Sequence, residues 1–175
     1  GGSQFSETWN FLINVHNDPP DPFALVYPES DMVLTEQQPT FTWEGSSSGD
    51  AGDHTSYRLE SGNSAESMGL VYEGDSTFYT PELSLEDNSV YYWRVIAIDL
   101  AFATTVNEGG YQSFVVNTAN DAPTVAELIS PDSVVVLSDL PTFSWNASTD
   151  VDPHDSLSYE LHWWTDVSEM DSILT

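Results

Sequence analysis

One sequence pattern occurs twice in this chain, and the length of that repeat limits what the chain can fold into. Thr40-Phe41-Thr42-Trp43 returns 102 residues later as Thr142-Phe143-Ser144-Trp145, and Asn17-Asp18 returns 103 residues later as Asn120-Asp121. A repeat of this length matches one whole domain. The sequence therefore predicts tandem domains of one kind.

The phase of the repeat divides the chain into three parts. Residues 1–17 match only the last strand of a unit, residues 18–120 form one complete unit, and residues 121–175 match the first half of another. We expect a segment of a longer array, in which the rest of the same chain completes the two partial units. Completion of the partial units by another chain is the alternative.

Apolar side chains in the complete unit alternate with a period of two, which is typical of half-buried strands. Tyr57 and Leu59 would face inward while Arg58 and Glu60 face solvent, and segment 91–99 alternates in the same way. Clusters of Pro, Gly, Asn and Asp separate these segments at the spacing of a sandwich. The pattern predicts an all-β fold.

The order of these features resembles a fibronectin type III domain. A proline-rich start precedes Trp43 in the second strand, Tyr57 follows in the third, and a Tyr91-x-Trp93 pattern lies in the penultimate strand. The resemblance extends over the complete unit and both fragments. It implies Ig-like β-sandwiches, one complete and two partial, with seven antiparallel strands in two sheets and aromatic cores. Because such domains serve many functions, the resemblance by itself indicates no activity.

Acidic residues gather in the loop after the second strand of each unit. In the last unit these residues are Asp150, Asp152 and Asp155. The aligned loop of the complete unit keeps only Asp50 and Asp53 of the three. Neighbouring carboxylates repel one another unless a cation or solvent lies between them, and Ca²⁺ takes six to eight oxygen ligands of this type. The loops are therefore candidate calcium sites, with a solvated surface turn as the alternative.

Two segments are similar to the calcium-binding linkers of cadherins and bacterial cadherin-like repeats. They are Asn120-Asp121-Ala122-Pro123 and Ala147-x-x-Asp150-x-Asp152. The candidate ligands of this second joint are Asn120, Asp121, Asp150, Asp152 and Asp155, with Glu86, Asp87 or Asp99 supplied by the preceding domain. The weaker candidates at the first joint are Asn17, Asp18, Asp50 and Asp53. Thr118 and Ala122 depart from the family pattern, so we expect one or two ions at the second joint.

The charge balance excludes several classes of partner. The chain carries 29 acidic residues against two Arg and no Lys, for a net charge of −27. Nucleic acid and anionic membrane surfaces need basic patches, so neither is an expected partner. The absence of Cys excludes disulfides and thiolate metal sites. No apolar run reaches membrane-spanning length, so we expect no membrane insertion.

Other candidate groups have plainer explanations. The four His, at positions 16, 54, 154 and 162, lack a second His at zinc-ligand spacing. Trp163 and Trp164 could stack on a sugar or could belong to a core. The outward face of segment 91–99 is unusually apolar, which suggests a contact surface, and we expect Arg94 to pair with Glu60 there.

We expect a non-catalytic repeat segment of an exported cell-surface or filament protein, acting as a stalk, an adhesin or a structural component. Calcium would stiffen the joints between neighbouring domains of the chain. Further partners would be other copies of the chain or a surface glycan or protein. The alternative is a spacer or carbohydrate-binding module of a secreted hydrolase. Both hypotheses place the chain outside the cell, and neither makes it an enzyme.

Overall fold

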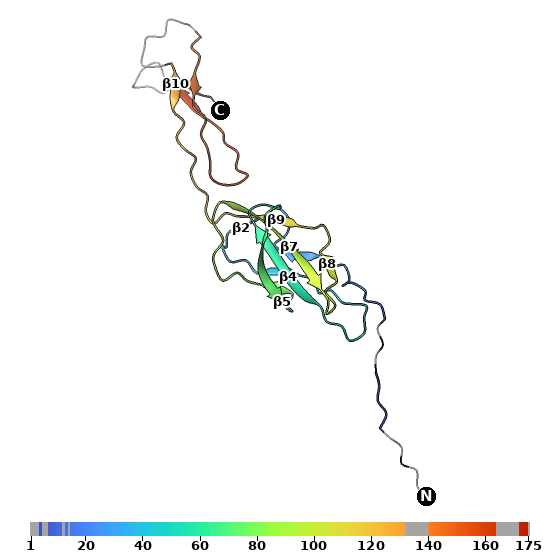
Figure 1. Ribbon diagram of the computed structural model, residues 1–175. Coiled ribbons are helices and arrows are strands. Elements are labelled where there is room, and N and C mark those ends of the chain that lie inside the picture. The colour runs from blue at the N-terminus through green and yellow to red at the C-terminus, as the bar shows by residue number, and fades with distance from the viewer. Residues whose placement is uncertain are drawn as a thin grey trace. The chain divides into compact units, whose positions relative to one another are not determined.

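The computed structural model describes residues 4, 7–11, 13, 15–131, 140–163 and 172–174. Every regular element in these ranges is a strand, so the all-β prediction is confirmed, and none of them offers a helix that could cross a membrane. The chain divides into two compact units, Gly1–Thr118 and Ala119–Thr175, which we call unit 1 and unit 2 (Figure 1).

Unit 1 is a sandwich of two sheets. The smaller sheet has the order β1 (Leu25–Tyr27), β3 (Phe41–Trp43) and β6 (Phe78–Tyr79). The larger sheet has the order β2 (Met32–Leu34), β9 (Gln112–Val116), β7 (Ser89–Ile98), β4 (Ser56–Gly62) and β5 (Gly69–Gly74), and β8 (Thr104–Val106) also pairs with β7. The neighbours are antiparallel except β2 and β9. This division of strands between two sheets is that of an Ig-like β-sandwich.

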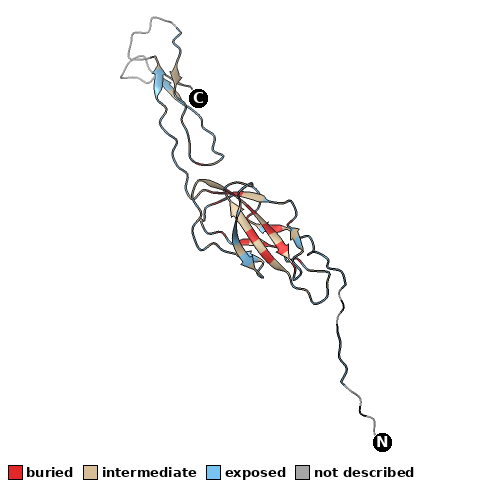
Figure 2. Cartoon of the chain, in the orientation of Figure 1, coloured by how far each residue is buried: buried red, intermediate tan, exposed pale blue. Residues whose placement is uncertain are grey.

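The core of unit 1 forms where the inward faces of the two sheets meet. Along β7, Trp93, Val95 and Ala97 are fully buried while the residues between them are partly exposed, as the predicted period of two requires (Figure 2). The ring of Phe41 from the smaller sheet packs edge-on against Trp93, with 5.0 Å between centroids. The aromatic core expected from the sequence is therefore present in unit 1.

Strand β7 also sets the distance between two acidic residues. Asp87 comes just before the strand and Asp99 directly after it. Ten strand residues span about 33 Å. Asp87 and Asp99 therefore lie at opposite ends of unit 1, and they cannot belong to the same ion site.

Unit 2 repeats the beginning of unit 1. β10 (Leu128–Ser130) pairs antiparallel with β11 (Ser144–Trp145), and β12 (Leu161–Trp163) pairs with β13 (Ser172–Leu174). The pair Leu128↔Trp145 repeats the pair Leu25↔Trp43 of unit 1, and a register shift follows each pair. The sequence repeat is thus also a repeat of strand pairing.

The described residues before Asn17 belong to no strand. Four large apolar side chains alternate along this segment and are exposed: Trp9, Phe11, Ile13 and Val15. This alternation is typical of a strand that buries one face against other strands. Its assignment to the last strand of a preceding sandwich stays a prediction.

Candidate metal centres

The two acidic loops share one backbone conformation. Loop 1 (residues 44–55) joins β3 to β4, and loop 2 (residues 146–160) joins β11 to β12. In loop 1 the Ser46 N–H donates to the hydroxyl of Tyr57 at 2.7 Å, and in loop 2 the Ser148 N–H donates to Tyr159 at 2.8 Å. A tyrosine therefore anchors each loop at the same point: Tyr57 lies in β4, and Tyr159 lies two residues before β12.

Each loop is also bound to the segment that precedes the first strand of its own unit. The Asp18 N–H donates to Asp50 Oδ2 at 2.9 Å, and the Asp121 N–H donates to Asp152 Oδ2 at 2.7 Å. Because the first residue of each pair belongs to an Asn-Asp boundary motif, the loop carboxylate fixes the backbone of the boundary. The predicted convergence of boundary motif and acidic loop is present in both units.

A left-handed residue closes the tip of each loop. Gly52 has φ of 84°, and the equivalent His154 has φ of 73°. This backbone region is open to glycine and strains a residue with a Cβ atom. Next to it, the Asp53 N–H donates to the Asp50 carbonyl at 3.2 Å, and the Asp155 N–H donates to the Asp152 carbonyl at 3.4 Å. The turn is therefore kept even where its glycine is replaced.

Loop 2 gathers three carboxylates at one point. An oxygen from each of Asp150, Asp152 and Asp155 lies within 4.8 Å of the other two. The backbone N–H of Asp152 donates to Asp150 Oδ1 at 3.0 Å, which holds the Asp150 side chain in place. Carboxylate oxygens at this spacing match the ligand set that Ca²⁺ prefers.

The central member of this group, Asp152, is buried and only half satisfied. Its side chain is 5% exposed, and while Oδ2 accepts the Asp121 N–H, Oδ1 has no hydrogen-bond partner. A buried carboxylate oxygen without a partner is costly, and such charges are normally paired or bound to a metal. Asp152 Oδ1 is therefore the atom that a cation would satisfy.

Asn120 takes no comparable position. It is exposed, and its carboxamide N–H donates to the neighbouring Asp121 carbonyl at 3.1 Å. In unit 1 the equivalent Asn17 donates to Asp99 Oδ2 at 2.7 Å. The boundary asparagine therefore donates to an acidic side chain in unit 1 and to its own backbone neighbour in unit 2.

Asp99 lies beside the candidates of the first joint, Asn17, Asp18, Asp50 and Asp53 (the first set), although the sequence placed it among those of the second joint (the second set). It is 4% exposed, and its Oδ1 accepts the N–H groups of Ala101 at 2.9 Å and Ala103 at 2.8 Å. Its Oδ2 receives the side chain of Asn17. The direction of β7 explains this position, because the strand ends beside Asn17, at the N-terminal end of the sandwich.

Asp53 of loop 1 contacts the segment that directly follows Asp99. The N–H groups of His54 and Leu100 donate to Asp53 Oδ1 at 2.8 and 3.1 Å. The Ser48 hydroxyl beside the carboxylate, followed by the His54 N–H, holds the pKa of Asp53 below its ordinary value. With Asn17, Asp50 and residues 51–52 and 100–101, Asp53 lines a hollow of about 260 Å³. Asn17, Asp50 and Asp53 of the first set thus line a space in which an ion would fit.

At the other end of unit 1, Asp87 holds the end of β9. Its Oδ1 accepts the Thr118 N–H at 2.8 Å and the Asn88 N–H at 3.0 Å, and its Oδ2 accepts the Thr118 hydroxyl at 2.6 Å. The Thr118 hydroxyl and N–H lower the pKa of Asp87. In the sequence, Thr118 is a departure from the cadherin-like pattern. In the structure, its N–H and hydroxyl both donate to Asp87 and so tie the end of β9 to the residues before β7.

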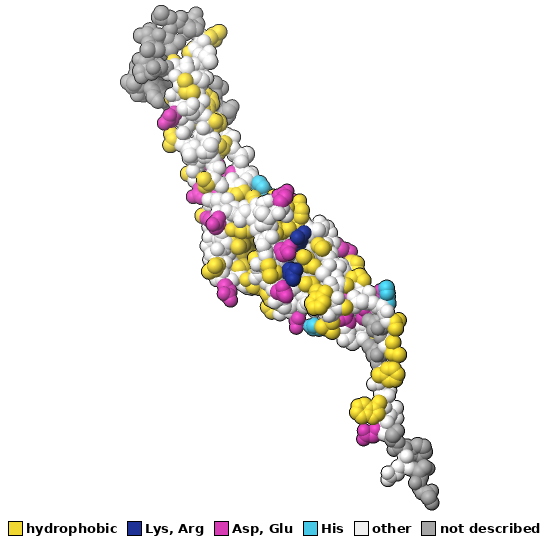
Figure 3. Space-filling model, in the orientation of Figure 1, with side chains coloured by type: hydrophobic (Ala, Val, Ile, Leu, Met, Phe, Trp, Pro, Cys, Tyr) yellow, Lys and Arg dark blue, Asp and Glu magenta, His cyan; other side chains and the backbone are white. Residues whose placement is uncertain are grey.

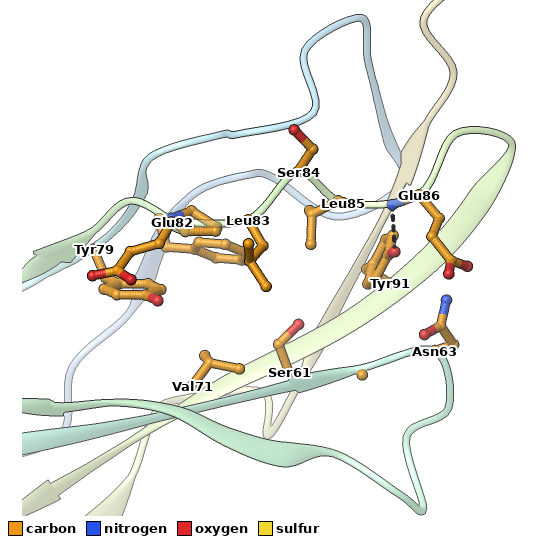
Figure 4. A pocket seen from close by; sticks show the side chains of 13 residues that line it. Ser61, Asn63, Val71, Tyr79, Glu82, Leu83, Ser84, Leu85, Glu86 and Tyr91 are labelled. Atoms are coloured by element: carbon orange, nitrogen blue, oxygen red, sulfur yellow. Dashed lines mark hydrogen bonds between the residues drawn. The ribbon is translucent and has the colours of Figure 1, made fainter.

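A groove opens in unit 1 between β5 and residues 81–86 (Figure 4). It has a volume of about 560 Å³, and its walls include Val71, Leu83 and Leu85. The Glu86 N–H donates to the Tyr91 hydroxyl at 2.8 Å at one end of it. Glu86 lines this groove, which shares no residue with either set of aspartates.

The remaining candidates take structural positions. The predicted pair of Arg94 with Glu60 is present at 2.7 Å. Trp163 is partly exposed and lies against Phe143, with 6.4 Å between ring centroids, and Trp164 lies outside the described residues. His54 faces Asp75 at 3.2 Å. The His54 backbone N–H donates to Asp53, whereas the described side chains of Arg94 and Trp163 make these contacts outside the aspartate sets.

Neither a protein-family model nor a curated protein matches this sequence. Among solved structures, the chain is similar to the sixth fibronectin type III domain of human fibronectin type III domain containing protein 3, with a TM-score of 0.42 and 21% identity over 65% of this chain and 98% of that domain. It is also similar to part of an α-L-rhamnosidase from Dictyoglumus thermophilum, with a TM-score of 0.43 and 15% identity over 67% of this chain and 16% of the enzyme. The strand order of unit 1 assigns the chain to the β-sandwich class. Within that class, the chain resembles a fibronectin type III domain.

Proposed function

We propose that this chain is a non-catalytic repeat segment of an exported cell-surface or filament protein, acting as a stalk, an adhesin or a structural component. In this proposal calcium binds at the boundary of each sandwich and stiffens the joint to its neighbour. The observation that carries it is the buried, unpartnered Oδ1 of Asp152 inside a group of three carboxylates.

The charge of the chain supports a cation from solution as the missing partner. The chain's two basic residues are Arg58 and Arg94, and both lie in unit 1, where they face Glu73 and Glu60. Unit 2 contains no Lys or Arg at all. The carboxylates of loop 2 therefore have no basic side chain in their own unit to neutralise them.

The repeated geometry supports a role at the joints. In both units the loop carboxylate receives the backbone N–H of the boundary motif, at Asp18 and at Asp121. An ion bound to Asp50 or Asp152 would therefore act directly on the segment that connects one sandwich to the next. Loop 1 has Ser48 in place of the carboxylate of Asp150, but its Asp50 and Asp53 line the hollow together with Asn17, whose side chain also donates to Asp99.

The expected affinity fits an extracellular setting. Calcium modules outside the cell have Kd values of about 10⁻⁴–10⁻³ M. An ion held mainly by surface loops of this kind should fall in that range. The joints would then be occupied in millimolar calcium and empty in a cell interior.

The test is calcium titration by isothermal calorimetry, with Asp150→Asn plus Asp152→Asn as the disabled variant. We expect binding by the wild-type chain near millimolar calcium and the loss of the loop 2 site in the variant. Glu127→Gln plus Glu160→Gln is the matched control, because it removes two exposed acidic charges from the same unit. Binding that is absent from the wild type, or that both variants reduce equally, would contradict a calcium site at loop 2.

A further inference from the structure

Both basic residues of the chain lie on one face of unit 1. Arg58 of β4 and Arg94 of β7 point outward from the larger sheet, on neighbouring strands (Figure 3). With His counted as neutral, the other charged residues of the chain are its 29 Asp and Glu. The outer face of the larger sheet, which we call the arginine face, is therefore the exception in a strongly anionic chain.

The charges of the arginine face balance one another. Arg94 binds Glu60, with Nη2 at 2.7 Å and Nε at 2.8 Å from the same carboxylate oxygen. Arg58 lies 3.4 Å from Glu73 of β5. Two positive and two negative groups thus leave this face locally neutral, while the chain as a whole carries −27.

Apolar side chains surround the two ion pairs. Ile96 lies between Arg58 and Val106 in the strand register, and Leu70 is opposite Glu60. Tyr92 packs edge-on against Tyr111 beside them, with 5.6 Å between ring centroids. Leu70, Val106 and Tyr111 are exposed, and Tyr92, Ile96 and Ile98 are partly exposed. The result is an extended apolar sheet face with two central ion pairs (Figure 3).

We propose that the arginine face is the contact through which two copies of this chain associate side by side. Two chains of charge −27 repel one another on acidic surfaces, so a locally neutral face is where they can approach most closely. The face is also complementary to itself, because each copy presents equal numbers of Arg and Glu among apolar side chains. Such a contact is isologous, with the same patch used by both copies.

Other classes of partner fit this face less well. An anionic partner, such as nucleic acid or an acidic glycan, would need free arginines, and both are occupied by glutamates. A cationic partner would be attracted to the acidic remainder of the chain. The same neutral face on a second copy of the chain needs no free arginine and is not drawn to the acidic surfaces.

The proposal predicts a specific dependence on salt. Association here buries apolar surface against the long-range repulsion of two polyanions, and added salt screens that repulsion. Self-association should therefore strengthen from low to moderate NaCl. A contact driven by opposite charges would weaken instead.

The test is sedimentation equilibrium of the whole chain, at concentrations up to about 1 mM and at two NaCl concentrations, in the presence of a calcium chelator. Leu70→Glu plus Val106→Glu places two charges on the arginine face at side chains that are 56% and 44% exposed, so the fold should tolerate both. Val26→Glu plus Leu83→Glu adds the same charge at exposed aliphatic side chains of the other sheet and the groove. Circular dichroism confirms that both variants are folded.

We expect a dimer that strengthens with salt, a Kd raised at least tenfold by Leu70→Glu plus Val106→Glu, and little change with the control pair. A monomer at every concentration would overturn the proposal. So would a dimer that both variants weaken equally, since added charge would then act by general repulsion, and so would a dimer that neither variant weakens, since its contact would lie elsewhere. Because calcium is chelated throughout, failure here leaves the calcium titration as a separate question.

Discussion

Unit 1 and unit 2 contain the same local structure with very different burial. Tyr57 and Tyr159 bind the equivalent loop N–H at 2.7 and 2.8 Å, but the first is 3% exposed and the second 37%. Leu25 is 8% exposed, and the equivalent Leu128 is 70% exposed. The two units therefore share the hydrogen bonds of the loop, but only in unit 1 are the equivalent Tyr and Leu side chains buried (Figure 2).

The difference separates short-range from long-range causes of structure. The Ser46–Tyr57 contact joins residues 11 apart, so the loop and its two flanking segments are enough to form it. The burial of Tyr57 and Leu59 needs the whole sandwich. Strand β7 places Ala97 and Val95 beside them, and the rings of Phe23 and Trp43 pack against Tyr57. Local geometry can therefore repeat faithfully in a unit whose described strands do not enclose a core.

The largest expected effect tests this difference directly. Trp43→Ala removes a ring that is buried against Tyr57 and Tyr72, so we expect a loss of roughly 3–5 kcal/mol in the free energy of unfolding. Trp145→Ala, at the equivalent half-exposed position, should cost roughly 1 kcal/mol. Urea unfolding followed by circular dichroism measures both. Equal losses would show that the two rings are buried alike, contrary to the comparison.

An exchange of one loop residue should reverse the calcium preference of the two loops. Ser48→Asp adds the missing carboxylate to loop 1, and Asp150→Ser removes it from loop 2. Because calcium affinity follows the number of charged ligands, we expect each change to shift the Kd of its own site by about tenfold, or 1.4 kcal/mol, in opposite directions. Calorimetry on the single and double variants measures this. If neither change alters binding, position 48 or 150 contributes no ligand.

The left-handed residue at the loop tip offers a smaller test. Gly52→Ala should destabilise unit 1 by about 1 kcal/mol, because its φ of 84° strains any residue with a Cβ atom. His154→Gly should have the opposite sign and relieve strain in loop 2. Thermal unfolding gives the first value, and amide exchange of the Asp155 N–H reports the second. A stabilising Gly52→Ala would mean that loop 1 does not keep this conformation in solution.

The smallest effect concerns pH at the opposite end of unit 1. The folded pKa of Asp87 lies below 3.8, because Thr118 donates two hydrogen bonds to the charged carboxylate. Its stabilisation is therefore complete above pH 3.8 and is lost as pH falls through the lowered folded pKa. Asp87→Asn should reduce stability at pH 7 and match the wild type in strong acid.

Thr118→Val is the control, because it removes the hydroxyl and keeps the backbone N–H. NMR titration of the Asp87 carboxyl should show its pKa rising toward 3.8 in this variant. An unchanged pKa would assign the effect to the backbone N–H groups alone.

The fold and part of the candidate site could be predicted from the sequence. The period of two along 91–99 identified the face of β7 that is buried, and the outward alternation of the same segment led to the pair of Arg94 with Glu60. The spacing between boundary motif and acidic loop was also enough to bring Asp121 to Asp152. In each case, alternation along a strand or proximity in one hairpin determines the contact.

Asp99 was assigned to the wrong end because that choice depends on strand direction. Asp87 and Asp99 are only 12 residues apart in sequence, yet an extended strand separates them by about 33 Å. The role of Thr118 was missed for a related reason, since the pairing of β7 with β9 is what brings Thr118 to Asp87. A hydroxyl residue at the end of a predicted strand gives no signal of such a partner.

By itself, the sequence determined what repeats: the strand alternation, the loop turns and the acidic positions, all of which depend on neighbours close along the chain. Only the tertiary structure decided which carboxylates meet, which of their oxygens is buried without a partner, and that both arginines share one neutral face. Those properties depend on strand order and direction, which bring together residues as distant as Asn17 and Asp99. Burial then determines which charged groups need a partner and which remain solvated.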